Sequence, residues 1–151
     1  MQRQTSIKFI LMLALVVFFL DRLMKEVVVT SLRLGEDIPL VPGILSVTYA
    51  KNPGAASGIF GDSGSIVLLA SIVSLAILIW GFRLFPASLF SRVGSGLVFG
   101  GAASNLADRL FVGAVTDYVH FFWWVLNGAD AAMTVGAAVL TFSVLKASAS
   151  R

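Results

Sequence analysis

Long apolar segments alternate with shorter polar ones along this chain. Four segments are apolar over close to the roughly 20 residues that a helix needs to cross a bilayer, namely residues 7–29, 65–82, 93–111 and 129–145. A helix satisfies all of its backbone hydrogen bonds internally, as lipid requires. We therefore predict an all-α polytopic membrane protein with four transmembrane helices, which forms a single domain over residues 1–151.

The first apolar segment has a second interpretation, as a secretory signal peptide. Arg3 and Lys8 precede or open the apolar residues 9–20, as in a signal sequence. However, Asp21-Arg22 follows in place of a small-residue cleavage site, and apolar residues resume at Val27. We predict an uncleaved first helix.

The composition agrees with a protein dissolved in lipid. Hydrophobic residues make up 58% of the chain and charged residues only 13%, against about 25% charged residues in a soluble domain. The net charge of +3 comes from scattered basic residues, which indicate membrane topology and argue against a nucleic-acid partner. With no cysteine and one histidine, disulfides, thiol catalysis and a Cys/His zinc site are excluded. We expect no metal and no cofactor.

Basic residues also predict the orientation. They lie before or at the start of the first segment, between the second and third, and after the fourth: Arg3, Lys8, Arg83, Arg92, Lys146 and Arg151. An even number of spans places them all on one side, which the positive-inside rule makes the cytoplasm. Both termini should therefore be cytoplasmic, and residues 30–64 and 112–128 should face outward.

The first outward segment should contain a small β-structure. Residues 38–41 and 44–49 are rich in β-branched and aromatic residues, and Pro42-Gly43 between them is a turn signal. We predict a hairpin or small sheet that lies on the outer membrane surface.

Charges in an apolar helix are costly and need an explanation. Asp21 and Lys25 are four residues apart, as are Arg22 and Glu26, so each pair can form an ion pair on one helix face. An interfacial ion pair suits Arg22 and Glu26. Asp21 and Lys25 could equally be a brace beneath an active site.

Two further motifs combine polar and small residues. Asn52-Pro53-Gly54-Ala55-Ala56-Ser57-Gly58 is either a plain loop or a wall beside a bound peptide. Asn105, Asp108 and Arg109 share a helix face at the end of the third segment, where a polar plug between helices is the alternative to a functional role.

Two aspartates approach the same outer end of the predicted bundle. Asp117 is the one acidic residue of residues 112–128 and is followed by aromatic residues, as in an interfacial belt. Asp130 opens the fourth helix behind Asn127, which could simply be an N-cap. Close carboxylates share a proton, so one can act as base and the other as acid in peptide hydrolysis. His120 is more readily explained as incidental.

The chain resembles bacterial lipoprotein signal peptidase, also called signal peptidase II. Five motifs in order carry the resemblance, which spans nearly the whole chain: Asp21 with Lys25, Asn52-Pro53-Gly54-Ala55-Ala56, Ser104-Asn105-Leu106-Ala107-Asp108-Arg109, Val115-Thr116-Asp117-Tyr118 and Asn127-Gly128-Ala129-Asp130. It implies four transmembrane helices with an extracytoplasmic β-cradle and a short outer segment.

The resemblance also implies the reaction and its residues. Asp117 and Asp130 correspond to the catalytic dyad. The supporting and substrate-binding positions are Asp21, Lys25, Asn52, Gly54, Asn105, Asp108, Arg109, Asn127 and Ala129. The implied substrate is a diacylglyceryl-modified prolipoprotein, cut just before its lipidated cysteine, in the bacterial inner membrane. We expect a monomer that contacts membrane lipids and binds globomycin-type inhibitors.

Three departures from the family pattern bear on pocket shape, lipoprotein preference and inhibitor fit. Ser57 replaces a large aromatic residue, Tyr118 replaces the commoner Phe, and the stretch from Asp117 to Asp130 is short. Alternative functions are a Ser/Lys protease that uses Ser57 with Lys25 or Lys51, a small ion or proton transporter, and a catalytically silent assembly protein. A transporter should keep polar residues at mid-membrane depth, whereas those of this chain gather toward the outer ends.

Overall fold

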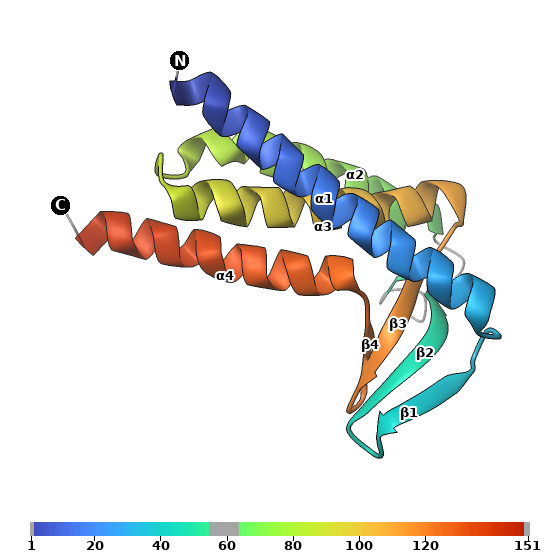
Figure 1. Cartoon of the computed structure of the whole chain (residues 1–151). Helices are drawn as coiled ribbons and strands as arrows, with labels where there is room; N and C mark the ends of the chain where they lie inside the picture. The colour runs from blue at the N-terminus through green and yellow to red at the C-terminus, as the bar shows by residue number, and fades with distance from the viewer. Residues whose placement is uncertain (1, 55–63, 150–151) are drawn as a thin grey trace.

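A computed structural model, which describes residues 2–54 and 64–149, shows a helical bundle with a small sheet at one end (Figure 1). The elements in chain order are α1 (Gln2–Ser31), β1 (Asp37–Val41), β2 (Leu45–Asn52), α2 (Gly64–Gly81), the 3-10 turn η1 (Phe82–Leu84), α3 (Leu89–Phe111), β3 (Val115–Phe121), β4 (Trp124–Leu126) and α4 (Gly128–Ala149). Ser57 and Asp62 lie outside the described residues, and so does Arg151.

The helices run side by side, and both chain termini lie at the end opposite the sheet (Figure 1). α3 packs against α1, α2 and α4. Its buried face consists largely of small residues: Ser91, Gly94, Ser95, Gly96, Gly100, Gly101 and Ser104. Small residues let helix backbones approach closely, as in membrane helix pairs.

Two of the described helices, over Ser65–Leu84 and Gly128–Ala149, are long and apolar enough by themselves to cross a membrane. α1 and α3 carry several charged residues in their second halves. Most of the large apolar side chains on α1 and α2 are exposed, an arrangement that suits contact with lipid.

The sheet has four antiparallel strands in the order β1-β2-β3-β4. The β1–β2 hairpin confirms the strands predicted around Pro42-Gly43. β3 and β4 were not predicted, because the aromatic residues of this stretch were interpreted as an interfacial belt. β3 pairs with β2, so that Ala50 lies opposite Asp117 next to an irregularity in the β2 register. Such bulges often redirect a side chain near a functional site.

The helix boundaries differ slightly from the predicted ones. α3 begins at Leu89, where Ser88 provides an N-cap and accepts a hydrogen bond from the Ser91 N–H. α4 continues to Ala149, beyond residue 145, where the predicted segment ends. Alanine is the strongest helix former, which accounts for the extension.

Candidate active site

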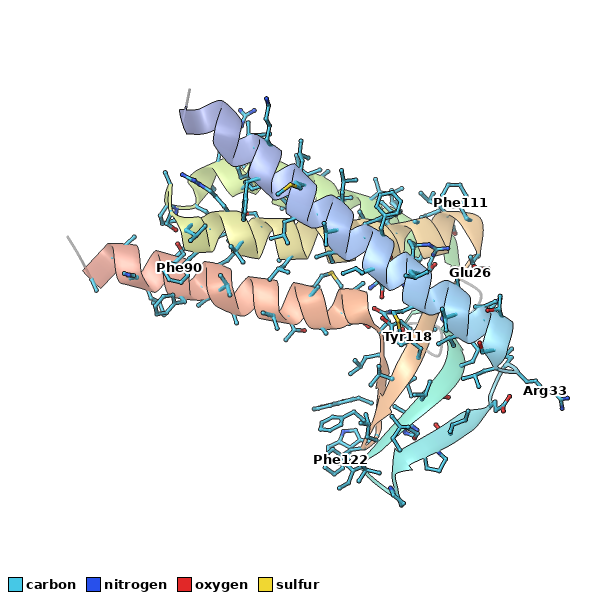
Figure 2. The ribbon with its side chains drawn as sticks, viewed as in Figure 1. Glu26, Arg33, Phe90, Phe111, Tyr118 and Phe122 are labelled. Carbon is cyan, nitrogen blue, oxygen red and sulfur yellow. The ribbon has the colours of Figure 1, made fainter. Side chains whose placement is uncertain are left out.

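Polar side chains from five elements meet where the helical bundle joins the sheet. They come from α1, α3, β2, β3 and the start of α4, including Asn127 just before that helix. Most of them are buried: Asp21, Lys25, Asn105, Asp108, Asp117 and Asn127 are each at most 4% exposed. Figure 2 shows Tyr118 at this junction. The structure therefore brings together residues that are up to 109 positions apart, from Asp21 to Asp130.

Asp117 is held by two side-chain amides. The Asn127 Nδ2 donates to its Oδ1 at 2.6 Å, and the Asn52 Nδ2 donates to its Oδ2 at 3.0 Å. The side chain is buried within β3, with the residue only 1% exposed. Both carboxylate oxygens are thus oriented by amide donors. Within the described residues, Asp117 forms no salt bridge.

Asp130 lies in the first turn of α4 and is partly exposed. Asn127 caps this helix, because its Oδ1 accepts the Asp130 N–H at 2.9 Å. In return the Asp130 Oδ2 accepts the Asn127 N–H at 3.3 Å, an exchange like that of a capping box. The capping role considered from the sequence is therefore confirmed.

The two aspartates share neighbours. Asn127 contacts both of them, and Asn105 donates from Nδ2 to the Asp130 Oδ1 at 2.8 Å. The Asn127 Nδ2 also lies 3.2 Å from the Asn105 Oδ1. This amide pair places the two carboxylates in one hydrogen-bonded network.

A cluster of four charged side chains on α1 and α3 lies next to that network. The Lys25 Nζ forms ion pairs with the Asp21 Oδ2 at 2.7 Å and the Asp108 Oδ2 at 2.9 Å, and donates to the Asn105 Oδ1 at 3.0 Å. Arg22 pairs with the other oxygen of Asp108. Two acids and two bases balance in charge, which offsets the cost of their burial.

The ion-pair partner of Arg22 differs from the one predicted from the sequence. Its expected partner was Glu26, one helical turn away, but it pairs with Asp108 on α3. Within the described parts of the chain, Glu26 forms no ion pair. The reason is burial: a carboxylate that is enclosed between helices attracts a cation more strongly than an exposed one does.

Several contributors were missed at the sequence level. The Ser104 Oγ donates to the Asp21 Oδ2 at 2.7 Å, and the Thr116 N–H donates to the Asp108 Oδ2 at 2.9 Å. Tyr118 was noted only as a departure from phenylalanine, yet its hydroxyl donates to the Asp21 Oδ1 at 3.0 Å and accepts the Gly128 N–H at 2.8 Å. Its polar tip therefore connects the sheet to α1 and α4.

The small residues before Asp130 are explained by this contact. The Ala129 N–H donates to the Asp21 Oδ1 at 3.0 Å, and Ala129 is completely buried. A Cβ at Gly128 would lie 2.5 Å from the Tyr118 hydroxyl. The start of α4 is thus fitted tightly against α1 and β3.

Gly54 and Arg109 lie at the margin of the site. The Gly54 N–H donates to the Asn52 Oδ1 at 2.9 Å. The backbone φ of Gly54 is 116°, a value that residues with a side chain rarely adopt. Arg109 donates to the Asn105 carbonyl oxygen of its own helix, and its buried Nε has no hydrogen-bond partner among the described residues. His120 lies apart from the site, 3.2 Å from Asp37 between Nδ1 and Oδ1.

The environment changes the acidity of two groups on β3. Burial raises the pKa of the Asp117 carboxyl, the amides of Asn52 and Asn127 oppose this, and the nearby Asp130 raises the pKa further. Burial next to Asp21 raises the pKa of the Tyr118 hydroxyl, which stays protonated as a donor. Within the described ranges, no three acidic or histidine side chains are placed to hold one metal ion.

Apolar helices with two neighbouring carboxylates at one end of the bundle define the class of a membrane enzyme. The model of the family described as Signal peptidase (SPase) II matches residues 13–146. The chain therefore belongs to the signal peptidase II family, as its motifs indicated, and it is a peptidase.

Curated relatives and solved structures agree with this assignment. The lipoprotein signal peptidase of Desulfitobacterium hafniense is 37% identical, with 86% of this chain and 88% of the relative covered. That of Geobacillus kaustophilus is 39% identical, with 85% and 87% covered. A solved bacterial membrane enzyme has a TM-score of 0.80 at 28% identity, over 98% of this chain and 92% of the other.

Proposed function

We propose that this chain is an aspartic endopeptidase that removes signal peptides from diacylglyceryl-modified prolipoproteins, with Asp117 and Asp130 as its catalytic pair. One observation carries the proposal: the Asn127 side chain contacts both Asp117 and the first turn of α4, which bears Asp130. The relatives named lipoprotein signal peptidase supply the substrate class. Cleavage is expected just before the lipidated cysteine, as the family motifs imply.

The reaction follows from the shared proton of the pair. One ionised carboxylate takes a proton from water as the water oxygen bonds to the scissile carbonyl carbon. The other, protonated, carboxyl donates to the carbonyl oxygen and so limits the charge that develops there. The tetrahedral intermediate then breaks its C–N bond, and a carboxyl proton passes to the leaving amine. The raised pKa of Asp117 supports the protonated role for this residue.

The supporting residues hold this pair in place. Asn52 and Asn127 orient Asp117, while Asn105 orients Asp130. Lys25 supports the Asn105 amide by donating to its Oδ1, and Asp21 and Asp108 hold Lys25 in place. The remaining supporting positions are Gly54 and Arg109 at the margin of the site, and Ala129, whose N–H holds the start of α4 against Asp21.

The membrane arrangement belongs to the same proposal. All four helices span the inner membrane, the termini are cytoplasmic, and the sheet lies at the extracytoplasmic face as part of one domain over residues 1–151. The apolar exposure of α1 and α2 supports this, and Asp21 of α1 and Asp108 of α3 are neutralised by ion pairs at the sheet end. The substrate lipid can then remain in the bilayer while its peptide reaches the pair. We expect a monomer that a globomycin-type inhibitor blocks at this site.

Two alternatives are less well supported. A Ser/Lys protease with Lys25 needs a lysine that can contact the serine, but its Nζ is engaged in ion pairs with Asp21 and Asp108. Ser57 lies outside the described residues, and Lys51 is exposed on β2. An ion relay requires polar groups along the bilayer, whereas α2 has no charged residue and the buried ion pairs gather at one end.

The test compares Asp117→Asn and Asp130→Asn with the wild type on a diacylglyceryl-modified prolipoprotein in detergent, followed by gel shift. Each variant should lose about 10²- to 10⁴-fold in rate, the usual contribution of a general acid or base, and should keep its thermal unfolding midpoint. Ser57→Ala is the control and should cleave normally. Comparable cleavage by either aspartate variant would refute the pair, and loss in Ser57→Ala would favour the serine alternative.

A further inference from the structure

A cavity lies at the opposite end of the bundle from the candidate active site. It has a volume of about 420 Å³ and lies between the start of α1, the turn η1 and the start of α3. In Figure 1 the connection between α2 and α3 lies at the same end as both chain termini. The mechanism proposed above makes no use of this cavity.

The lining of the cavity separates into a cationic and an apolar part. Arg83 and Arg92 supply two guanidinium groups, and Ser91 and Ser95 supply hydroxyls. Ile7, Ile10, Phe82, Phe85 and Pro86 form the apolar wall. A ligand that fits this lining has an anionic group joined directly to an apolar one.

Within the described residues, neither arginine has an acidic side chain as counter-ion. None of the described residues that line the cavity is acidic, and the ion pairs of the described chain involve neither Arg83 nor Arg92. Seven of the eight acidic residues fall within residues 21–37 and 108–130, and the eighth, Asp62, precedes α2. None of the described acidic side chains therefore neutralises these two guanidinium groups.

The start of α3 adds to the positive potential. Its N-terminus, capped by Ser88, lies beside the cavity, and a helix N-terminus favours anions. Ser95 is only 2% exposed, whereas Ser91 is already hydrogen-bonded to Ser88 and Ser143. The Ser95 hydroxyl is thus the one placed to donate to a bound oxyanion.

We propose that this cavity binds an anionic glycerophospholipid of the cytoplasmic leaflet. Arg83 and Arg92 hold the headgroup phosphate, because guanidinium groups pair with phosphate oxygens in a forked geometry. The first acyl segments lie against the apolar wall. The choice of leaflet rests on the orientation given under the proposed function, but the binding site itself does not.

The test measures lipid retention by native mass spectrometry from neutral maltoside micelles that contain phosphatidylglycerol. The wild type should retain one phosphatidylglycerol in preference to phosphatidylcholine. The double variant Arg83→Gln/Arg92→Gln should bind about 30-fold more weakly, since each basic residue near a lipid surface contributes roughly fivefold. Equal retention by wild type and double variant, or equal binding of phosphatidylcholine, would overturn the proposal.

Two further variants separate the cavity from general surface charge. Ala87 lines the cavity without charge, so Ala87→Trp should fill it and abolish retention while the net charge is unchanged. Lys8 is exposed on α1 outside the cavity lining, and Lys8→Gln should change binding by no more than about fivefold. If Lys8→Gln weakens retention as much as the double variant, or Ala87→Trp retains the lipid, the cavity is not the site.

A competition experiment in the same micelles tests whether the cavity binds a water-soluble phosphate compound in place of a lipid. Glycerol 3-phosphate should fail to displace the lipid, and displacement would mean that the cavity binds a water-soluble anion instead. Asp117→Asn should retain phosphatidylglycerol like the wild type. Because retention is measured without a peptide substrate, failure of the proposed peptidase mechanism and failure of the lipid site give different results.

Discussion

Asn127 illustrates how much a single side chain determines at this site. The side-chain Oδ1 of Asn127 caps α4 by accepting the Asp130 N–H, and its side-chain Nδ2 donates to the Asp117 Oδ1. Aspartate could serve as the cap, but it has no amide protons to donate. Asparagine is therefore required by the combination of the two contacts.

Asn127→Ser should separate these roles. Serine keeps the N-cap but cannot reach Asp117 with an amide, so the two carboxylates lose their common support. We expect kcat to fall by about 10²-fold, the cost of a small misplacement in an active site, with little change in the thermal unfolding midpoint. Ser88→Ala, which removes the cap of α3, is the matched control and should lower the midpoint without a comparable loss of kcat.

Asn52 should control the pH dependence. Its amide favours the ionised form of Asp117 and thus lowers a pKa that burial has raised. Without it, the pKa of Asp117 rises further, so this carboxyl keeps its proton to higher pH. Asn52→Leu should therefore move the alkaline limb of the kcat/KM profile upward by roughly 0.5–1 pH unit. A limb that stays fixed or moves down, or an equal shift in Lys51→Gln, would contradict this role.

At the scale of elements, α3 is the structural centre of the site. It carries Asn105 and Asp108 and packs closely against both α1 and α4. A Cβ at Gly101 would lie 2.5 Å from the Ala129 carbonyl oxygen and 2.8 Å from the Met133 Cγ. The close packing of these helices thus fixes the position of the turn that bears Asp130.

Gly101→Ala should consequently affect both stability and activity. The methyl group has to push α4 away, and such overpacking costs about 1–3 kcal/mol. We expect a lower thermal unfolding midpoint together with slower cleavage of the prolipoprotein. Gly81→Ala is the matched control, because a Cβ at Gly81 has nothing within 4 Å, and it should leave both quantities unchanged.

The sequence predicted elements well where the signal was local. Each of the four apolar segments is continuous in the sequence and corresponds to a helix. The turn at Pro42-Gly43 lies between β1 and β2, as its local sequence predicted. β3 was missed although residues 115–119 contain β-branched residues, because its pairing with β2 spans some 70 positions. A still larger separation of 86 positions hides the contact of Arg22 with Asp108, which no helical spacing suggests.

At the scale of the whole molecule, the two ends of the bundle have opposite character. The sheet end holds the described ion pairs, while the end with the termini holds Arg83 and Arg92. Figure 2 shows Arg33 directed away from the molecule at the sheet end. This difference provides a direct way to test the proposed orientation.

Single-cysteine labelling can make that test without background, because the chain has no cysteine. In intact cells, a membrane-impermeant maleimide should label Arg33→Cys and leave Ala87→Cys unlabelled until the membrane is permeabilised. The reason is the positive-inside rule, which retains the arginine-rich connection in the cytoplasm. The reverse labelling pattern would invert the topology and place the candidate pair on the wrong side for secreted lipoproteins.

The ion pairs between α1 and α3 also affect how the protein is made. α1 emerges from the ribosome long before α3, and until α3 arrives, Arg22 and Lys25 have only Asp21 and Glu26 as nearby acids on the same helix. Asp108 on α3 in turn has no cation until it meets α1. We expect α1 to remain beside the insertion machinery until α3 enters the bilayer, since charges left in lipid are costly. A chain in which these helices fail to meet would expose unpaired charges to lipid, a defect that membrane quality-control proteases could recognise.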